Sequence, residues 1–189
     1  MRLVIVTYSD APECRKENVK KIQEHLKNEG VEVEVYVGGK NYIENIYNAL
    51  KTSKEDTIMM EDDIILCKDF MKNVQKAIQE HPDKVINFFN VVKPCSETKE
   101  YEGHLWTECQ CVFLPKRVVY RIVDLKESFK RNLPKSYERN LADNYLAFSI
   151  RESWVQYIPC LVQQNAFKST IYEGNIDSQT IFFIDDLYN

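Results

Sequence analysis

The sequence predicts an α/β fold: one domain with a mainly parallel central sheet that helices flank on both faces. Two observations lead to this prediction. Short apolar runs with strand character alternate along the chain with stretches of helical spacing, and such alternation is typical of parallel sheets. The chain also has 189 residues, of which 44% are hydrophobic and 29% are charged. That composition suits one globular domain with a sizeable core.

The first three predicted strands follow from their residue patterns. Leu3 to Thr7 is an aliphatic and β-branched run, which indicates a buried strand. From Val31 to Val37 every second residue is valine, which is the period of a half-exposed strand. Thr57 to Met60 is the third predicted strand, and acidic residues follow it directly.

Three predicted helices follow these strands. Val19, Ile22 and Leu26 have helical spacing within a stretch that begins near Cys14 and stops at Gly30. The same spacing predicts helices over 43–50 and 70–78.

The second half of the chain continues the pattern to about residue 163. We expect strands over 85–89, 111–114 and 154–158, helices over 115–125 and 141–150, a mobile loop over 92–104, an exposed basic stretch over 126–139, an extended segment over 159–163, and an edge strand or docking tail over 180–184. No repeat or linker interrupts the chain. Residues 1–189 are therefore expected to form a single domain, with about 173–189 as a C-terminal tail.

Charge, cysteine and glycine usage narrow the classes of function. The net charge of −4 argues against a dominant surface for polyanions. No apolar run reaches the roughly 18 residues of a transmembrane segment, and the N-terminus does not resemble a signal peptide, so we expect a cytoplasmic protein. None of the six cysteines forms a CxxC pair, which favours free thiols. The glycine-rich phosphate motifs GxGxxG and GxxxxGK[ST] are absent.

The acidic triplet Glu61-Asp62-Asp63 is the strongest functional signal in the sequence. It lies between the apolar runs 57–60 and 64–66, where three adjacent carboxylates are costly unless a positive charge compensates them. A divalent cation such as Mg²⁺ or Mn²⁺ suits carboxylate oxygens. The carboxyl end of a sheet strand is also where α/β proteins bind phosphate-bearing ligands. A solvated acidic turn is the alternative interpretation.

Three blocks of sequence together resemble a family of enzymes. They are the acidic turn at 60–64, Gln110-Cys-Val-Phe-Leu-Pro-Lys-Arg117, and a third block that comprises 141–146, 157–164 and 168–171. Over about residues 1–172 their order is similar to that in small GT-A-type glycosyltransferases, including family 25 (lipopolysaccharide-type). The resemblance implies a GT-A-like (Rossmann-like) fold. It also implies transfer of a sugar from a nucleoside-diphosphate sugar, with UDP-sugars favoured, to an acceptor hydroxyl.

In this family the acidic, DXD-like motif holds Mn²⁺ or Mg²⁺ on the donor diphosphate. The resemblance implies that Asp63 is the direct metal ligand and that Asp62 or Glu61 contacts the donor or the metal. Gln164 stands where the family often has a ligand histidine, and an amide oxygen is a weaker ligand than imidazole. Metal dependence is therefore open. Lys168 is a candidate for neutralising the diphosphate directly.

The resemblance also assigns donor, acceptor and catalytic residues. Thr7, Tyr8 and Asp10 follow the first strand, where the family binds the nucleotide, although a capping turn is the alternative. Asp143 lies near the start of a predicted helix, where the family has its base, although such an aspartate is also a common helix cap. In the stretch expected to meet the acceptor, Trp106 and Glu108 are the candidates.

The identity of the acceptor is open at this stage. A saccharide, a protein or a hydroxymethylated DNA base, as in phage DNA glycosylation, would each provide a hydroxyl. A basic stretch that includes Lys126 and Lys130 would suit DNA, but a solvated surface is the simpler interpretation. Two other functions fit the same motifs: a non-catalytic nucleotide-sugar-binding module and a metal-dependent nucleotide phosphohydrolase.

Overall fold

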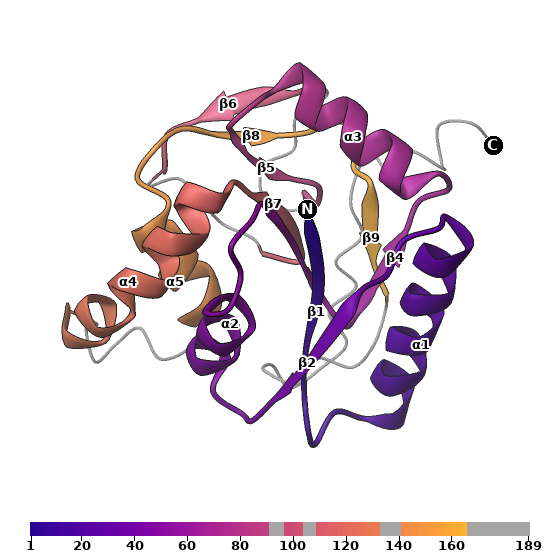
Figure 1. The fold of residues 1–189 in the computed structure, drawn as a ribbon, viewed down its shortest axis with the longest axis horizontal. Coiled ribbons are helices and arrows are strands. Elements are labelled where there is room, and N and C mark those ends of the chain that lie inside the picture. Colours follow the sequence, from indigo (N-terminus) through magenta and orange to yellow (C-terminus); the bar gives the residue numbers. More distant parts are fainter. Residues whose placement is uncertain (91–96, 104–108, 133–140, 166–189) are drawn as a thin grey trace.

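A computed structural model describes residues 1–90, 97–103, 109–132 and 141–165 (Figure 1). Within these residues, seven strands form one sheet in the order β2-β1-β3-β7-β5-β8-β6, and β4 and β9 form a separate pair. The strands of the large sheet are β1 (Arg2–Tyr8), β2 (Glu34–Gly38), β3 (Thr57–Glu61), β5 (Val85–Asn87), β6 (Lys99–Tyr101), β7 (Cys111–Leu114) and β8 (Trp154–Gln156).

The large sheet is mainly parallel, as the sequence predicted. β1 runs parallel to both β2 and β3, and β5 runs parallel to β8. β7 is antiparallel to β3 and to β5, and β6 is antiparallel to β8. In the described sheet, five strands therefore point one way, and β7 and β6 point the other.

Helices cover both faces of this sheet (Figure 1). The helices are α1 (Glu13–Asn28), α2 (Tyr42–Leu50), α3 (Phe70–Glu80), α4 (Lys116–Asn132) and α5 (Leu141–Ser149). Because side chains alternate along a strand, β1 divides the core into two halves. Leu3 and Ile5 pack in the half that includes α1 and α3, whereas Val4 and Val6 pack in the half that includes α2, α4 and α5.

The topology marks one edge of the sheet as a ligand-binding edge. The chain passes from β1 through α1 to β2 on one side of β1, and then through α2 to β3 on the other side. The strand order thus reverses around β1, and α/β proteins bind ligands beyond the carboxyl ends of strands at such a reversal. Thr7 and Tyr8 end β1 there, and Glu61 ends β3.

The small sheet extends this edge. β4 (Ile64–Leu66) follows the acidic turn and pairs antiparallel with β9 (Val162–Gln164). The register places Ile64 opposite Gln164. Two blocks that are about 100 residues apart in sequence therefore lie side by side.

Several predicted boundaries differ from the structure. The expected loop over 92–104 contains β6, a short strand at the edge of the sheet in which Lys99 and Glu100 are exposed. The helix predicted to end near Leu125 continues to Asn132 and takes in part of the expected basic surface. The proposed elements over 168–184 and the predicted tail lie outside the described residues.

Membrane-spanning helices were not predicted. Among the helices that the structure describes, none combines the length and apolar character that crossing a bilayer requires.

Candidate functional site

The acidic turn is buried, so the interpretation as a solvated turn is wrong. Asp62 and Asp63 connect β3 to β4, and they are only 2% and 3% exposed. Carboxylates rarely reach this degree of burial unless they are paired. The structure must therefore supply a positive partner for them.

Arg15 of α1 is that partner. Its Nη1 donates to Asp62 Oδ1 at 2.5 Å, and its Nη2 donates to Asp63 Oδ2 at 2.8 Å. Arg15 itself is 6% exposed. Burial lowers the pKa of Arg15, but the carboxylates of Asp63 and Asp62 outweigh burial and raise that pKa above its usual value. Arg15 therefore remains a cation that neutralises one of the two buried charges.

Neighbouring polar groups fix the shape of the turn. Thr7 Oγ1 donates to Asp62 Oδ2 at 2.5 Å. Asn18 Nδ2 donates to the backbone oxygens of Asp62 and Ile64 at 2.9 and 2.8 Å. The backbone N–H of Asn165 donates to the backbone carbonyl oxygen of Asp63 at 2.6 Å. The turn is thus held from β1, from α1 and from the residue after β9.

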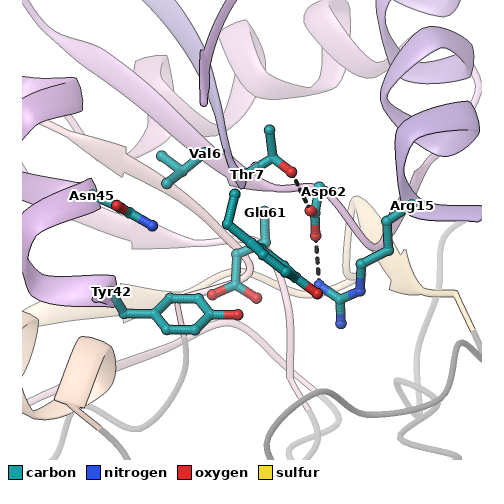
Figure 2. A pocket seen from close by; sticks show the side chains of 8 residues that line it. Val6, Thr7, Arg15, Tyr42, Asn45, Glu61 and Asp62 are labelled. Atoms are coloured by element: carbon teal, nitrogen blue, oxygen red, sulfur yellow. Dashed lines mark hydrogen bonds and ion pairs between the residues drawn. The ribbon is translucent and has the colours of Figure 1, made fainter. Parts of the chain in front are cut away.

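A small pocket adjoins the turn, and Figure 2 shows the side chains that line it. It is lined by Val6, Thr7 and Tyr8 from β1, Arg15 from α1, Tyr42 and Asn45 from α2, and Glu61 and Asp62. In Figure 2, Arg15 reaches Asp62 from one side, and Tyr42 and Asn45 lie on the other side. The pocket volume of about 10 Å³ leaves room for about one water molecule.

The side of the pocket formed by α2 depends on close packing with β2. Asn45 Nδ2 donates to the Gly39 oxygen at 2.8 Å. A Cβ atom at Gly38 would lie 1.9 Å from Asn45 Oδ1, so only glycine allows this approach. Glycine at the end of β2 therefore helps to hold Asn45 against the pocket.

A second group of titratable side chains adjoins the turn. Cys109 Sγ donates to Glu61 Oε1 at 3.1 Å, and the same thiol also interacts with Asp143 in the first turn of α5. Burial, together with the charge of Asp63, raises the pKa of Glu61 to about 8. Burial raises the pKa of Asp143 to about 6. At pH 7, Glu61 is therefore mostly protonated, while Asp143 is mostly ionised.

The Asp143 carboxylate has an unused oxygen. Its Oδ1 atom is buried and has no hydrogen-bond partner within the described parts of the chain. Burial of an unpaired oxygen is unfavourable, and a catalytic role is one of the explanations for such an atom in a native structure. The structure therefore brings Asp143, which the sequence offered as a base, to the acidic turn through Cys109.

The predicted metal ligands lie together, and they fit a cation only in part. Gln164 Nε2 donates to Asp63 Oδ2 at 3.3 Å, while Asp63 Oδ1 is buried without a partner among the described residues. Both oxygens of Asp62 are already bonded to Arg15 and Thr7. The described residues contain no cluster of three or more His, Cys, Asp or Glu that could hold a metal alone.

This arrangement matches one known way of binding Mg²⁺. Magnesium is commonly held by one or two protein oxygens together with the phosphates of the substrate. Asp63 Oδ1 offers one such oxygen, and rotation of the Gln164 amide would offer a second. The predicted ligands Asp63 and Gln164 thus fit a cation that arrives with a diphosphate. The role of Asp62 as a metal ligand stays a prediction.

The remaining predicted residues are placed as follows. Tyr8 lines the pocket, whereas Asp10 is exposed and its nearest cation is Lys40 at 3.7 Å. Asp10 is therefore outside the pocket. Trp106, Glu108 and Lys168 lie outside the described residues, so their assigned roles stay predictions.

Sequence reasoning missed part of this site. The sequence did not identify Arg15 as the partner of the acidic turn, but in the structure it is buried against the Asp62 and Asp63 carboxylates. Asn18, Tyr42, Asn45 and Cys109 were not singled out. One signal was available for Arg15 and Asn18: with Val19, Ile22 and Leu26 they follow the three- and four-residue spacing of one helix face, which is the buried face of α1.

The basic stretch is largely neutralised where the structure describes it. Lys126 and Lys130 both bind the carboxylate of Glu44 on α2, and Lys126 also lies 3.8 Å from the centre of the Tyr47 ring. These two lysines therefore join α4 to α2. This pairing leaves less positive charge for a DNA surface than the sequence suggested.

Comparisons with known proteins support the fold. No protein-family model matches the chain, and no curated protein matches it. Among solved structures, the chain is similar to S. aureus TarS (residues 1–349), with a TM-score of 0.52 at 13% identity. That match covers 88% of this chain and 61% of the TarS chain, so this chain spans less than two thirds of its neighbour. The likeness confirms the predicted α/β fold.

A second solved structure matches the chain more weakly. It is a glycosyltransferase involved in the glycosylation of the major capsid of PBCV-1, at 10% identity over 84% of this chain and 94% of that chain. Its TM-score of 0.40 is too low to carry an argument. Membership of family 25 and the GT-A type stay predictions.

Proposed function

We propose that the chain is a glycosyltransferase that uses a nucleoside-diphosphate sugar and a divalent cation. One observation carries this proposal: a buried acidic turn ends β3 at the reversal of strand order, and a second carboxylate, Asp143, lies beside it with its Oδ1 atom buried. The first feature suits a cation and a diphosphate. The second suits removal of a proton from an acceptor hydroxyl.

The charge of the turn explains why a cation would be needed. Asp62 and Asp63 carry two negative charges, and Arg15 supplies one positive charge. A diphosphate would meet a net negative site unless another cation accompanied it. When bound, Mn²⁺ or Mg²⁺ would neutralise the charge that develops on the leaving diphosphate. Asp63 and Gln164 would hold it, with Lys168 as a candidate second partner for the phosphates.

Asp143 has the properties of a general base. A base acts best when its pKa is near the working pH, and the pKa of Asp143 is raised to about 6. Its Oδ1, which has no hydrogen-bond partner among the described residues, can accept the proton of an acceptor hydroxyl. A general base in this role belongs to transfer with inversion. Determining the anomeric configuration of the product therefore tests this role of Asp143.

The nucleotide would bind at the carboxyl end of β1, beside Thr7 and Tyr8. The pocket there is too small for a nucleotide base, so binding requires Tyr8 of β1 and Tyr42 of α2 to move apart. A tyrosine ring that moves can then stack on the base. UDP-sugars are the first donors to test.

The acceptor carries a hydroxyl and is a saccharide, a protein or a hydroxymethylated DNA base in this proposal. A saccharide is the simplest choice, because Lys126 and Lys130 are occupied by Glu44. A DNA acceptor would need the basic residues beyond 132 instead.

The test is a transfer assay on the full chain. A panel of nucleotide sugars with Mn²⁺ is incubated with saccharide, protein and hydroxymethylated DNA acceptors, and both sugar transfer and donor hydrolysis are measured. The variant Asp63→Asn should abolish transfer and cation-supported nucleotide binding, while Asp124→Asn, an exposed aspartate on α4, should behave as the unaltered chain.

Other outcomes would identify the competing functions. Donor binding without transfer or hydrolysis, across the whole panel, would indicate a non-catalytic binding module. Release of phosphate from the nucleotide without transfer of sugar would indicate a phosphohydrolase. Full activity of Asp63→Asn would show that the acidic turn is not the site.

A further inference from the structure

Two buried atoms of opposite character lie unused on either side of one ion pair. Arg15 Nη2 donates to Asp63 Oδ2 at 2.8 Å. Within the described residues, Arg15 Nε has no acceptor, and Asp63 Oδ1 has no donor. Nε is an N–H donor that suits an anion, and Oδ1 is an oxygen that suits a cation. Each is an unsatisfied polar atom inside the protein, which is unfavourable.

Neither a cation alone nor an anion alone suits this arrangement. A divalent cation on Asp63 Oδ1 would share a single carboxylate with the Arg15 guanidinium, and the two positive charges would repel each other in a buried site. A free diphosphate on Arg15 Nε would meet the carboxylates of Asp62 and Asp63, which lie 2.5 and 2.8 Å from the same guanidinium.

A cation that is already paired with a diphosphate avoids both conflicts. In such a pair the cation can bind Asp63 Oδ1, and the phosphate oxygens can accept a hydrogen bond from Arg15 Nε. Both unused atoms are then satisfied together, and the negative phosphates separate the metal from the guanidinium. Gln164, 3.3 Å from Asp63 Oδ2, is positioned to adjust its amide to either state.

We propose that Arg15 is an internal counter-cation that excludes a divalent cation from the acidic turn until a nucleoside diphosphate binds with it. Cation and nucleotide then bind cooperatively, each raising the affinity for the other by the same factor. This inference rests on the cation-assisted donor site of the proposed function. Arg15 acts through the carboxylates and the cation, so it is a positioning residue.

The experiment measures Mn²⁺ binding by calorimetry on the full chain, with and without UDP. The unaltered chain should bind Mn²⁺ at least tenfold more tightly when UDP is present. Arg15→Gln removes the guanidinium charge, and it should bind Mn²⁺ alone at least tenfold more tightly than the unaltered chain does. UDP should add less to the Mn²⁺ affinity of this variant.

A matched control separates local charge from net charge. Lys16→Gln makes the same change in charge one residue further on, at an exposed side chain 3.7 Å from Glu13. It should bind Mn²⁺ as the unaltered chain does. A gain in Lys16→Gln equal to that in Arg15→Gln would overturn the role of Arg15.

Thermal unfolding keeps the proposal testable if Arg15→Gln is unstable. That variant leaves two buried carboxylates unpaired, so its Tm should fall, and Mn²⁺ without UDP should restore it. Arg15→Lys keeps the charge, so its affinity for Mn²⁺ alone should stay low. The proposal is overturned if Mn²⁺ alone binds the unaltered chain as tightly as it binds Arg15→Gln.

The nucleotide arm distinguishes failure of this inference from failure of the proposed function. If UDP, GDP, ADP and CDP all fail to bind in the presence of Mn²⁺, the proposed function is wrong. If a nucleotide binds but does not change Mn²⁺ affinity, the donor site stands and the cooperative role of Arg15 is wrong.

Discussion

At the scale of single residues, Asp143 shows how burial adjusts a carboxylate to a task. Its pKa is raised from 3.8 to about 6 because it is desolvated, and the Cys109 thiol opposes that shift. The carboxylate is therefore ionised at neutral pH, yet it binds a proton more readily than an exposed aspartate would. Both properties are needed in a general base.

The first prediction concerns Asp143→Asn. If Asp143 is the base, this variant should lower kcat by about 10²–10⁴-fold with little change in the KM for the donor. In the unaltered chain, activity should fall as the pH drops through about 6, because Asp143 then becomes protonated. Steady-state kinetics between pH 5 and 9 measure both effects. Unchanged turnover would leave Asp143 with a structural role in the first turn of α5.

The second prediction concerns the thiol between the two carboxyl groups. Cys109 hydrogen bonding lowers the pKa of Glu61 and that of Asp143. Cys109→Ala removes this bond, so both pKa values should rise, and the acidic limb of the pH–rate profile should move to higher pH. Cys14→Ala, at an exposed cysteine, is the control. An unmoved profile in Cys109→Ala would contradict the assigned contact.

Residues of the site differ in how far the sequence reveals them. The acidic turn could be predicted, because its charges interrupt apolar residues within one short segment. Helical spacing could place Arg15 on the buried face of α1, but it could not reveal the partners of Arg15, which lie 47 and 48 positions away. Cys109 shares that difficulty, since it meets Glu61 only after β7 pairs with β3.

At the scale of elements, α1 does more than cover the sheet. Its buried face carries Arg15 and Asn18 as well as Val19, Ile22 and Leu26. The apolar residues pack in the core with Leu3 and Ile5 of β1. The same helix therefore holds the sheet and the acidic turn together, and a change in its position would move both.

The third prediction tests this attachment with Asn18→Ala. The change leaves the carbonyl oxygens of Asp62 and Ile64 without their side-chain donor. It should lower the free energy of unfolding by about 2 kcal/mol, within the usual range for buried groups left unsatisfied. Urea denaturation measures the loss. Asn73→Ala is the control, since the Asn73 amide binds the Lys68 oxygen in an exposed setting and its loss should cost less than half as much.

Elements with strong apolar patterns were predicted well, and those fixed by distant contacts were not. β1, α2 and β7 follow directly from their buried residues. β6 was missed because Lys99–Tyr101 is polar and short, and it becomes a strand only by pairing with β8. α4 continues past Leu125 because Lys126 and Lys130 form ion pairs with Glu44 on α2. No local sequence pattern reveals this contact.

At the scale of the whole molecule, the buried carboxyl groups link stability to pH. Glu61, Asp143 and Asp63 all have raised pKa values in the folded chain, chiefly because they are buried. Between their ordinary values and their raised values, the folded chain binds more protons than the unfolded chain. The stability that these three groups contribute is therefore present at low pH, and this contribution is lost as the pH rises toward about 8.

The fourth prediction is a decrease in Tm by several degrees between pH 5.5 and 8.5, since about 1 kcal/mol shifts Tm by roughly 2–4 °C at this size. Glu61→Gln removes the largest contribution, so its Tm at pH 8.5 should exceed that of the unaltered chain, and its pH dependence should be weaker. Calorimetry in buffers without divalent cations measures both. A Tm that rises with pH over this range would contradict the burial of these groups.

The overall fold was predictable because it depends on patterns that repeat many times along the chain. Alternating strand and helix signals predict a mainly parallel sheet, and an error of a few residues at any element boundary does not change that prediction. The reversed directions of β7 and β6 were not predictable in the same way, because an apolar run such as Cys111–Leu114 has no signal for direction. Pairing with β3 determines the direction of β7.

The three-sided attachment of the acidic turn has a consequence for how the chain matures on the ribosome. Thr7, Arg15 and Asn18 are synthesised early, and Asp62 and Asp63 follow about 45 residues later. Gln164 and Asn165, which hold Asp63 from the remaining side, emerge about 100 residues after that. A nascent chain that has passed residue 63 can thus form the Arg15 ion pairs long before the site is complete. Under the role proposed for Arg15, these ion pairs would shield the two carboxylates from free metal ions throughout that interval.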